Sequence, residues 1–253
     1  MTPLEADYSP STCVASLDDE LDAYRLASHA ARDTLPHRVV PYGNHPDEWS
    51  VVFDADGAST LLIFIHGGYW QALSAWESLM PAPACIDRGV SFAAVNYTLA
   101  PHATIGEIID QVRRATATLI EVTGCAAVVV AGSSAGAHLA AHVAQHEPRI
   151  GRTVLLSGVY QLAPLVHTYI NDALGLTDEQ AAAWSVDLTR RPAGELIIVH
   201  GEHETRAFKA QSAAAAAAWN VAVVEVARRN HFDLVFELPA LALDDGPARP
   251  ATD

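Results

Sequence analysis

The sequence predicts a single α/β domain in which a mostly parallel central sheet is flanked by helices on both faces. The chain has 253 residues, half of them hydrophobic, which is enough for one large core. Short apolar runs alternate with longer segments of helical periodicity, a pattern typical of parallel strands joined by helices. We expect strands at 37–41, 49–54, 61–65, 91–96, 126–131, 153–157, 195–200 and 221–226, and helices at 74–87, 104–122, 135–147, 205–219 and 232–238.

Three segments fall outside this alternation. Residues 17–35 combine helically spaced apolar residues with an acidic start, which favours a helix that caps the site. Residues 160–191 lie between two strands and form a predicted insertion. The tail, 244–253, contains Pro and Asp and is expected to be disordered. We treat 1–253 as one domain.

The most informative motif is Gly-Ser-Ser-Ala-Gly at 132–136, directly behind the apolar run 126–131. A sharp turn from a strand into a helix requires glycines on either side of it and presents the central side chain above the sheet. Ser134 is therefore a candidate nucleophile. The alternative is an ordinary Gly/Ser turn, which is common in α/β proteins.

A second motif follows the apolar run 61–65 and reads His-Gly-Gly-Tyr-Trp at 66–70. Successive glycines let backbone N–H groups approach a ligand closely. In α/β-hydrolases such a loop, together with the residue after the nucleophile, forms the oxyanion hole. We expect the donors to be the N–H groups of Gly68, Tyr69 and Ala135. The alternative is a Gly-Gly β-turn with Tyr69 and Trp70 in the core.

An acid and a base follow in the chain order of the α/β-hydrolases. Glu202 and Glu204 both lie just beyond the apolar run 195–200, and either could orient a histidine. His231 follows the last predicted strand and would accept the proton of Ser134. The residues alone leave both glutamates open as the acid.

Four segments together resemble the kynurenine formamidase (arylformamidase) branch of the α/β-hydrolase superfamily. They are 66–70, 131–138, 201–212 and 230–232. In that branch the acid stands three residues after a glycine and before Ser or Thr, and this alignment selects Glu204. The branch usually has Asp there, so the Glu is a departure from its pattern.

The resemblance implies a serine hydrolase that cleaves the N-acyl bond of N-acylated aromatic amines, such as N-formylkynurenine or N-acylanthranilates, without a metal or cofactor. It also implies that 160–191 forms a lid, whose Leu165 and Tyr169 would complete an apolar substrate pocket with Tyr69 and Trp70. Plain packing of the lid onto the sheet is the alternative. A carboxylesterase for aryl or short-chain esters, and a non-catalytic binding protein of the same fold, are the alternative functions. Acyl length, aryl group and oligomeric state, including a homodimer, stay open.

Charge and composition limit the partners and the compartment. The chain carries 15 basic and 30 acidic residues, a net charge of −15, which argues against nucleic acid or anionic membranes as partners. No apolar run approaches the roughly 18 residues of a membrane span, and the first ten residues lack the features of a signal peptide. Three scattered cysteines are typical of reduced thiols. We therefore expect a cytoplasmic enzyme with a small-molecule substrate.

Histidines recur every fourth residue at 138, 142 and 146. This spacing places them on one face of the helix after the Ser134 motif, where they could ligate a metal. No carboxylate or cysteine partner is evident in the sequence. We therefore expect a partly exposed polar stripe and no metal.

Overall fold

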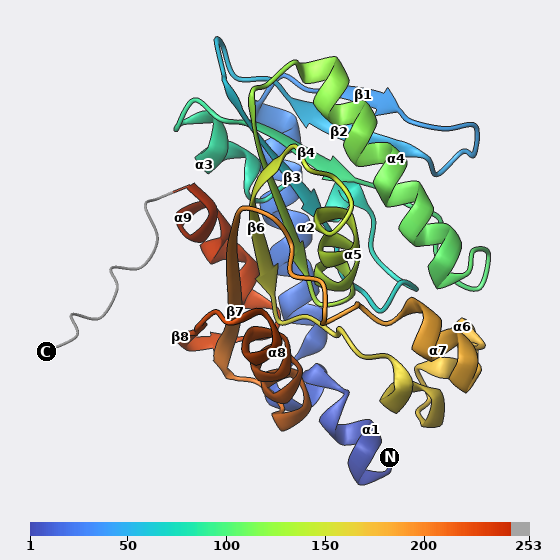
Figure 1. The fold of residues 1–253 in the computed structure, drawn as a ribbon. Helices are drawn as coiled ribbons and strands as arrows, with labels where there is room; N and C mark the ends of the chain where they lie inside the picture. The colour runs from blue at the N-terminus through green and yellow to red at the C-terminus, as the bar shows by residue number, and fades with distance from the viewer. Residues whose placement is uncertain (244–253) are drawn as a thin grey trace, which may run out of the picture.

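The central feature of the protein is an eight-stranded sheet with the strand order β1-β2-β4-β3-β5-β6-β7-β8 (Figure 1). The computed structural model describes residues 1–243, so the expectation for the tail 244–253 lies outside the described residues. β2 is antiparallel to β1 and β4, and the other neighbouring pairs are parallel. The strands are β1 Arg38–Pro41, β2 Trp49–Phe53, β3 Thr60–Ile65, β4 Ser91–Val95, β5 Ala127–Ser133, β6 Ile150–Leu156, β7 Glu195–His203 and β8 Val223–Asn230.

The α-helices are α1 Pro3–Asp7, α2 Leu17–Thr34, α3 Ala82–Ile86, α4 Ile105–Thr123, α5 Ala135–Ala144, α6 Asn171–Leu174, α7 Asp178–Trp184, α8 Arg206–Trp219 and α9 Leu238–Leu243. The 3-10 helices are η1 Pro10–Cys13, η2 Ala75–Glu77, η3 Ala163–His167 and η4 Asp233–Glu237. The first turn of α4 shows why these boundaries form. Thr104 and Glu107 make a reciprocal capping box there, and Gly124 ends the helix in a left-handed conformation.

Helices cover both faces of the sheet because alternate strand residues point to opposite sides. In β3, Leu61, Ile63 and Ile65 join a core with residues of α4, α5 and α8. Leu62 and Phe64 join a second core with residues of α2, α3 and α9. Figure 1 shows α2 and α5 on opposite faces of the sheet. The predicted α/β-hydrolase fold is confirmed.

Some predicted boundaries were wrong. The expected helix at 74–87 is instead the short η2 and α3, because Pro81 and Pro83 lack the N–H groups that a continuous helix needs. β8 begins at Val223, not at 221, because the N–H of Val221 still bonds to the end of α8. The expected helix at 232–238 is η4 followed by α9. The first helices, α1 and η1, were not expected.

The insertion between β6 and β7 consists of η3, α6 and α7 and lies beside α5 and the sheet (Figure 1). Its contact with α5 is made by the carbonyl oxygen of Trp184, which accepts hydrogen bonds from His138 at 2.7 Å and His142 at 3.0 Å. Among the helices of residues 1–243, none is long and apolar enough to cross a bilayer.

Candidate active site

Ser134 occupies the turn between β5 and α5 in a strained conformation, with φ 57° and ψ −119°. The two flanking glycines make this turn sterically feasible. A Cβ atom on Gly132 would lie 2.1 Å from the carbonyl oxygen of Gly136, and one on Gly136 would lie 2.0 Å from that of Ile65. Both positions therefore require glycine, as the motif predicted.

The loop after β3 passes directly over this turn. A Cβ on Gly67 would lie 3.1 Å from the Cβ of Ser134, so the two backbones are in contact. Gly68, Tyr69 and Trp70 all have positive φ, at 90°, 51° and 59°. The Gly68 carbonyl accepts hydrogen bonds from the N–H groups of Gln71 at 2.9 Å and Ala72 at 3.0 Å, which folds the loop back on itself.

Three backbone donors near Ser134 are left free by this geometry. Within residues 1–243, the N–H groups of Gly68, Tyr69 and Ala135 have no acceptor. Unpaired N–H groups at buried or half-buried positions are uncommon. Their presence on both segments that adjoin Ser134 is what a binding site for an oxyanion requires.

Glu204 and His231 form a buried pair. Glu204 follows β7 and His231 follows β8, so both lie at the carboxyl edge of the sheet. Ser134 follows β5 and lies at the same edge. The Oε2 atom of Glu204 lies 3.0 Å from Nδ1 of His231, and their side chains are 0% and 5% exposed. Its Oε1 atom accepts hydrogen bonds from Ser157 Oγ at 2.5 Å and from the N–H of Gly201 at 2.6 Å.

These bonds decide the ionisation of Glu204. Burial alone would raise the pKa of the carboxyl. The hydrogen bond and charge of His231, and the hydrogen bonds from Ser157 and Gly201, outweigh burial and hold the pKa below its usual value. The competing Glu202 is exposed and accepts a bond from the N–H of Arg228 at 2.7 Å. Glu204, not Glu202, contacts the histidine.

Two supporting residues were missed at the level of sequence. Ser157, in a left-handed conformation with φ 48°, directly follows β6 and holds Glu204. Asn230 accepts bonds from the N–H groups of Phe232 and Asp233 and so shapes the loop that carries His231. A small polar residue directly after an apolar strand, and an Asn directly before the histidine, were the available signals.

A pocket of about 300 Å³ has Ser134 and His231 on its wall. The wall also includes the predicted Tyr69 and Tyr169, the latter 49% exposed. Trp70 and Leu165 are 0% exposed within the core and are not part of the wall, so the structure does not support the prediction that they contact substrate. The apolar wall includes Leu17, Leu21, Leu73, Met80, Phe232 and Val235.

The N-terminal segment closes one side of the pocket, a role that its sequence did not indicate. Pro10 and Ser11 belong to the wall. Tyr69 donates to the carbonyl of Tyr8 at 2.6 Å, and Tyr169 bonds to Ser9 at 2.9 Å. These contacts connect η1 to the loop after β3 and to the insertion.

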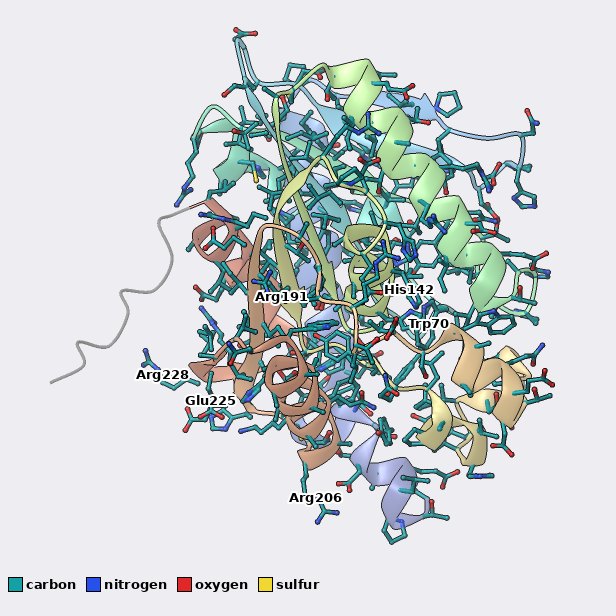
Figure 2. All side chains as sticks on the ribbon, in the orientation of Figure 1. Trp70, His142, Arg191, Arg206, Glu225 and Arg228 are labelled. Atoms are coloured by element: carbon teal, nitrogen blue, oxygen red, sulfur yellow. The ribbon has the colours of Figure 1, made fainter. Side chains whose placement is uncertain are left out.

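The histidine stripe of α5 is partly exposed, as expected: His146 is exposed, His142 is half-buried and His138 is buried. His138 is fully buried and stands edge-on to Trp70, with ring centroids 5.2 Å apart. Figure 2 shows His142 on α5 and Trp70 beside this helix. Within residues 1–243, no group of three or more His, Cys, Asp and Glu side chains is arranged to hold a metal ion. His138 and His142 attach the insertion to α5 through the carbonyl oxygen of Trp184.

The fold and the site together define the class of the protein. A strained serine turn, free N–H groups and an acid–histidine pair at the carboxyl edge of a mostly parallel sheet are the features of an α/β hydrolase. The sequence model of a family described as "alpha/beta hydrolase fold" matches residues 62–194. The chain therefore belongs to the α/β-hydrolase family.

Known relatives narrow this class. A protein of Danio rerio named kynurenine formamidase is 30% identical over 264 residues, which cover 93% of this chain and 90% of the relative. A Salmo salar protein of the same name is 34% identical over 196 residues, covering 70% and 67%. The predicted resemblance is thereby confirmed: this chain is a kynurenine formamidase-like α/β hydrolase.

Solved structures share the fold. A structure described as a candidate thioesterase from Silicibacter sp. has a TM-score of 0.86 at 25% identity and covers 99% of this chain and 97% of its own. An esterase of Pyrobaculum calidifontis has a TM-score of 0.69 at 16% identity, covering 88% and 85%, and shares the fold. The relatives together support an amide or ester hydrolase.

Proposed function

We propose that this protein is a serine hydrolase that cleaves the N-acyl bond of N-acylated aromatic amines, with Ser134 as nucleophile, His231 as base and Glu204 as acid. The observation that carries the proposal is the buried Glu204–His231 pair, whose histidine lines the same pocket as the strained Ser134. A nucleophile, a base and an orienting group at one pocket are the parts that acyl transfer needs.

The proposed reaction proceeds through an acyl-enzyme. Nε2 of His231 accepts the Ser134 proton as Oγ bonds to the carbonyl carbon, and the carbonyl oxygen becomes an oxyanion. The free N–H groups of Gly68, Tyr69 and Ala135 stabilise that charge. His231 then gives the proton to the leaving nitrogen as the C–N bond breaks. A water molecule next attacks the acyl-enzyme while His231 accepts its proton, and His231 returns that proton to Ser134 Oγ as the carboxylic acid product leaves. Glu204 holds Nδ1–H throughout and stabilises the imidazolium. No step requires a metal or cofactor.

The aromatic amide substrate is supported by the name of the relatives and by the pocket. Both fish proteins are named kynurenine formamidase, which makes N-formylkynurenine the first compound to test, followed by N-acylanthranilates. Tyr24, Phe64 and Phe232 belong to the pocket wall and suit an aryl ring. The same apolar wall would also accept aryl or short-chain esters, so a carboxylesterase is the second candidate.

A turnover panel tests the proposal. Purified enzyme would be given N-formylkynurenine, N-acylanthranilates of increasing acyl length and matched p-nitrophenyl esters. Ser134→Ala should abolish nearly all turnover, whereas Ser59→Ala, an exposed serine at the opposite edge of the sheet, should retain it. An organophosphorus inhibitor should label Ser134, as read by mass spectrometry.

Each result has a distinct meaning. Ser134-dependent amide turnover supports the aryl-amidase, and ester turnover alone supports the carboxylesterase. Turnover that survives Ser134→Ala would refute the assigned nucleophile. Silence on the whole panel together with no labelling would favour a non-catalytic binding protein of this fold.

A further inference from the structure

The direction of each free N–H group in the loop after β3 depends on the carbonyl that shares its peptide unit. A trans peptide group is planar, so its C=O and N–H point in opposite directions. The carbonyl opposite the N–H of Tyr69 is that of Gly68, which the N–H groups of Gln71 and Ala72 hold in place. The direction of the Gly68 N–H depends in the same way on the carbonyl of Gly67.

The carbonyl of Gly67 is held by the side chain of His66. Nδ1 of His66 lies 2.9 Å from this oxygen, and because a carbonyl can only accept, Nδ1 carries the proton that it donates. Glycines on both sides of the Gly67–Gly68 peptide allow it to rotate at little steric cost, and Gly68 already has a φ of 90°. The peptide therefore keeps its direction only while the imidazole of His66 keeps its own position.

Tyr97 contacts both the ring and the backbone of His66. The two rings are stacked, with centroids 4.2 Å apart and an angle of 9° between their planes. The hydroxyl of Tyr97 donates to the carbonyl of His66 at 3.0 Å and lies 3.3 Å from that of Gly67. Tyr97 and His66 are each only 2% exposed, so water has little access to replace these contacts.

The segment that carries Tyr97 is itself fixed. It lies between β4 and α4, and the N–H of Thr98 donates to Oε1 of Gln111 on α4 at 2.8 Å. Further along this segment, the N–H of Ala100 donates to the carbonyl of Trp70 at 2.8 Å. The connection between β4 and α4 therefore holds the loop after β3 at both of its ends.

We propose that Tyr97 is a positioning residue for the oxyanion site: acting through His66, it fixes the Gly67–Gly68 peptide so that the N–H of Gly68 points at the developing oxyanion. The inference rests on the proposed function, because the oxyanion belongs to that reaction. The pocket wall includes His66, Gly67 and Gly68 but not Tyr97, so Tyr97 acts without touching the substrate. Its effect should appear in the transition state, where the oxyanion forms, and not in substrate binding.

The kinetic test uses Tyr97→Phe, which removes the hydroxyl and keeps the stacked ring. With p-nitrophenyl acetate, kcat should fall about tenfold or more, short of the roughly 10²–10³-fold loss that follows deletion of a donor. KM should stay within about threefold of wild type. An aryl trifluoromethyl ketone, which forms a tetrahedral adduct with a nucleophilic serine, should lose affinity by the same factor as kcat/KM. Thr116→Val is the matched control, because it removes a buried hydroxyl that bonds only the carbonyl of Val112 within α4 in the described chain, and it should leave these values unchanged.

Hydrogen exchange keeps the inference separate from the proposed function. The amides of Gln71 and Ala72 bond to the Gly68 carbonyl, so their exchange rates, measured by NMR, report how firmly the loop is held. These rates should rise about tenfold or more in Tyr97→Phe and stay unchanged in the control variant, and urea unfolding of both variants separates a local effect from a global loss of stability. Unchanged exchange, an unchanged kcat, a rise in KM alone, or changes that the control shares would overturn the inference. Absence of Ser134-dependent turnover would refute the proposed function, while the exchange rates would still decide whether Tyr97 holds the loop.

Discussion

Replacing Glu204 by Gln should hold His231 in the tautomer that cannot accept the proton of Ser134. The two donors at Oε1, Ser157 Oγ and the N–H of Gly201, both need an acceptor. The Gln amide oxygen will therefore take that position and leave the amide NH₂ facing Nδ1 of His231. An NH₂ group there can only donate, so Nδ1 must accept and the ring proton moves to Nε2. A protonated Nε2 cannot accept the proton of Ser134.

The magnitude follows from the same contacts. Restoring the productive tautomer requires the amide to flip, which leaves two buried donors unsatisfied at about 1–3 kcal/mol each. A penalty of about 2–6 kcal/mol lowers kcat by about 30-fold to 10⁴-fold. The fold should persist, because the Gln side chain keeps the volume of Glu204 and the bonds at its oxygen.

The assay is steady-state hydrolysis of an aryl ester, with circular dichroism as the check on folding. Glu202→Gln is the matched control, because its carboxylate is exposed and bonds only the N–H of Arg228 in the described chain. It should keep kcat within about threefold of wild type. A Glu204→Gln enzyme that is as active as this control would refute the role given to Glu204.

Three further predictions concern the fold around the site. Gly136→Ala should destabilise the protein by about 3 kcal/mol or more in urea unfolding, since its Cβ would lie 2.0 Å from the carbonyl of Ile65, whereas Gly151→Ala, with 3.9 Å of room, should change stability by no more than about 0.5 kcal/mol. The pKa of Glu204 is held below its usual value of 4.5, so the ionised carboxylate should stabilise the fold above about pH 4.5 and lose this effect as pH falls through the lowered pKa. The difference in urea midpoint between wild type and Glu204→Gln should therefore become smaller on acidification. A difference that grows would contradict the assignment of Glu204 as an ionised, paired carboxylate. Removing residues 1–13 should raise KM by roughly tenfold with a smaller change in kcat, since this segment walls the pocket but supplies no reacting group; an unchanged KM would show that the wall is dispensable.

The sheet and the candidate triad could be predicted because each depends on local sequence. Strands buried on both faces are unbroken apolar runs, so β3, β5 and β7 were visible without knowledge of their neighbours. Ser134 comes shortly after such a run, Glu204 lies four residues beyond the run 195–200, and His231 follows β8, a partly buried strand whose polar end adjoins the loop. The carboxyl edge of a parallel sheet therefore brings them together without any information about long-range packing.

The pocket could not be predicted in the same way, because its wall depends on contacts between distant segments. Ser9 meets Tyr169 across 160 positions of sequence, and η1 has no periodicity that marks it as a wall. Trp70 follows the loop at the site, but its positive φ turns the side chain into the core beside His138. An aromatic residue near a motif does not reveal on which side of the backbone it will lie.

The contact between α2 and the loop that carries His231 makes the two ends of the described chain depend on each other. Tyr24 donates to the carbonyl of Phe232 at 2.6 Å, and Asn230 donates to Glu20 at 2.8 Å. During synthesis, His231, the proposed base, can be positioned only after β8 has emerged, so a chain truncated before this strand would have a serine turn without the histidine. If His231 is the base, as proposed, substitutions on α2 that reshape the pocket will also shift His231, so changes in specificity and in catalytic rate will be coupled.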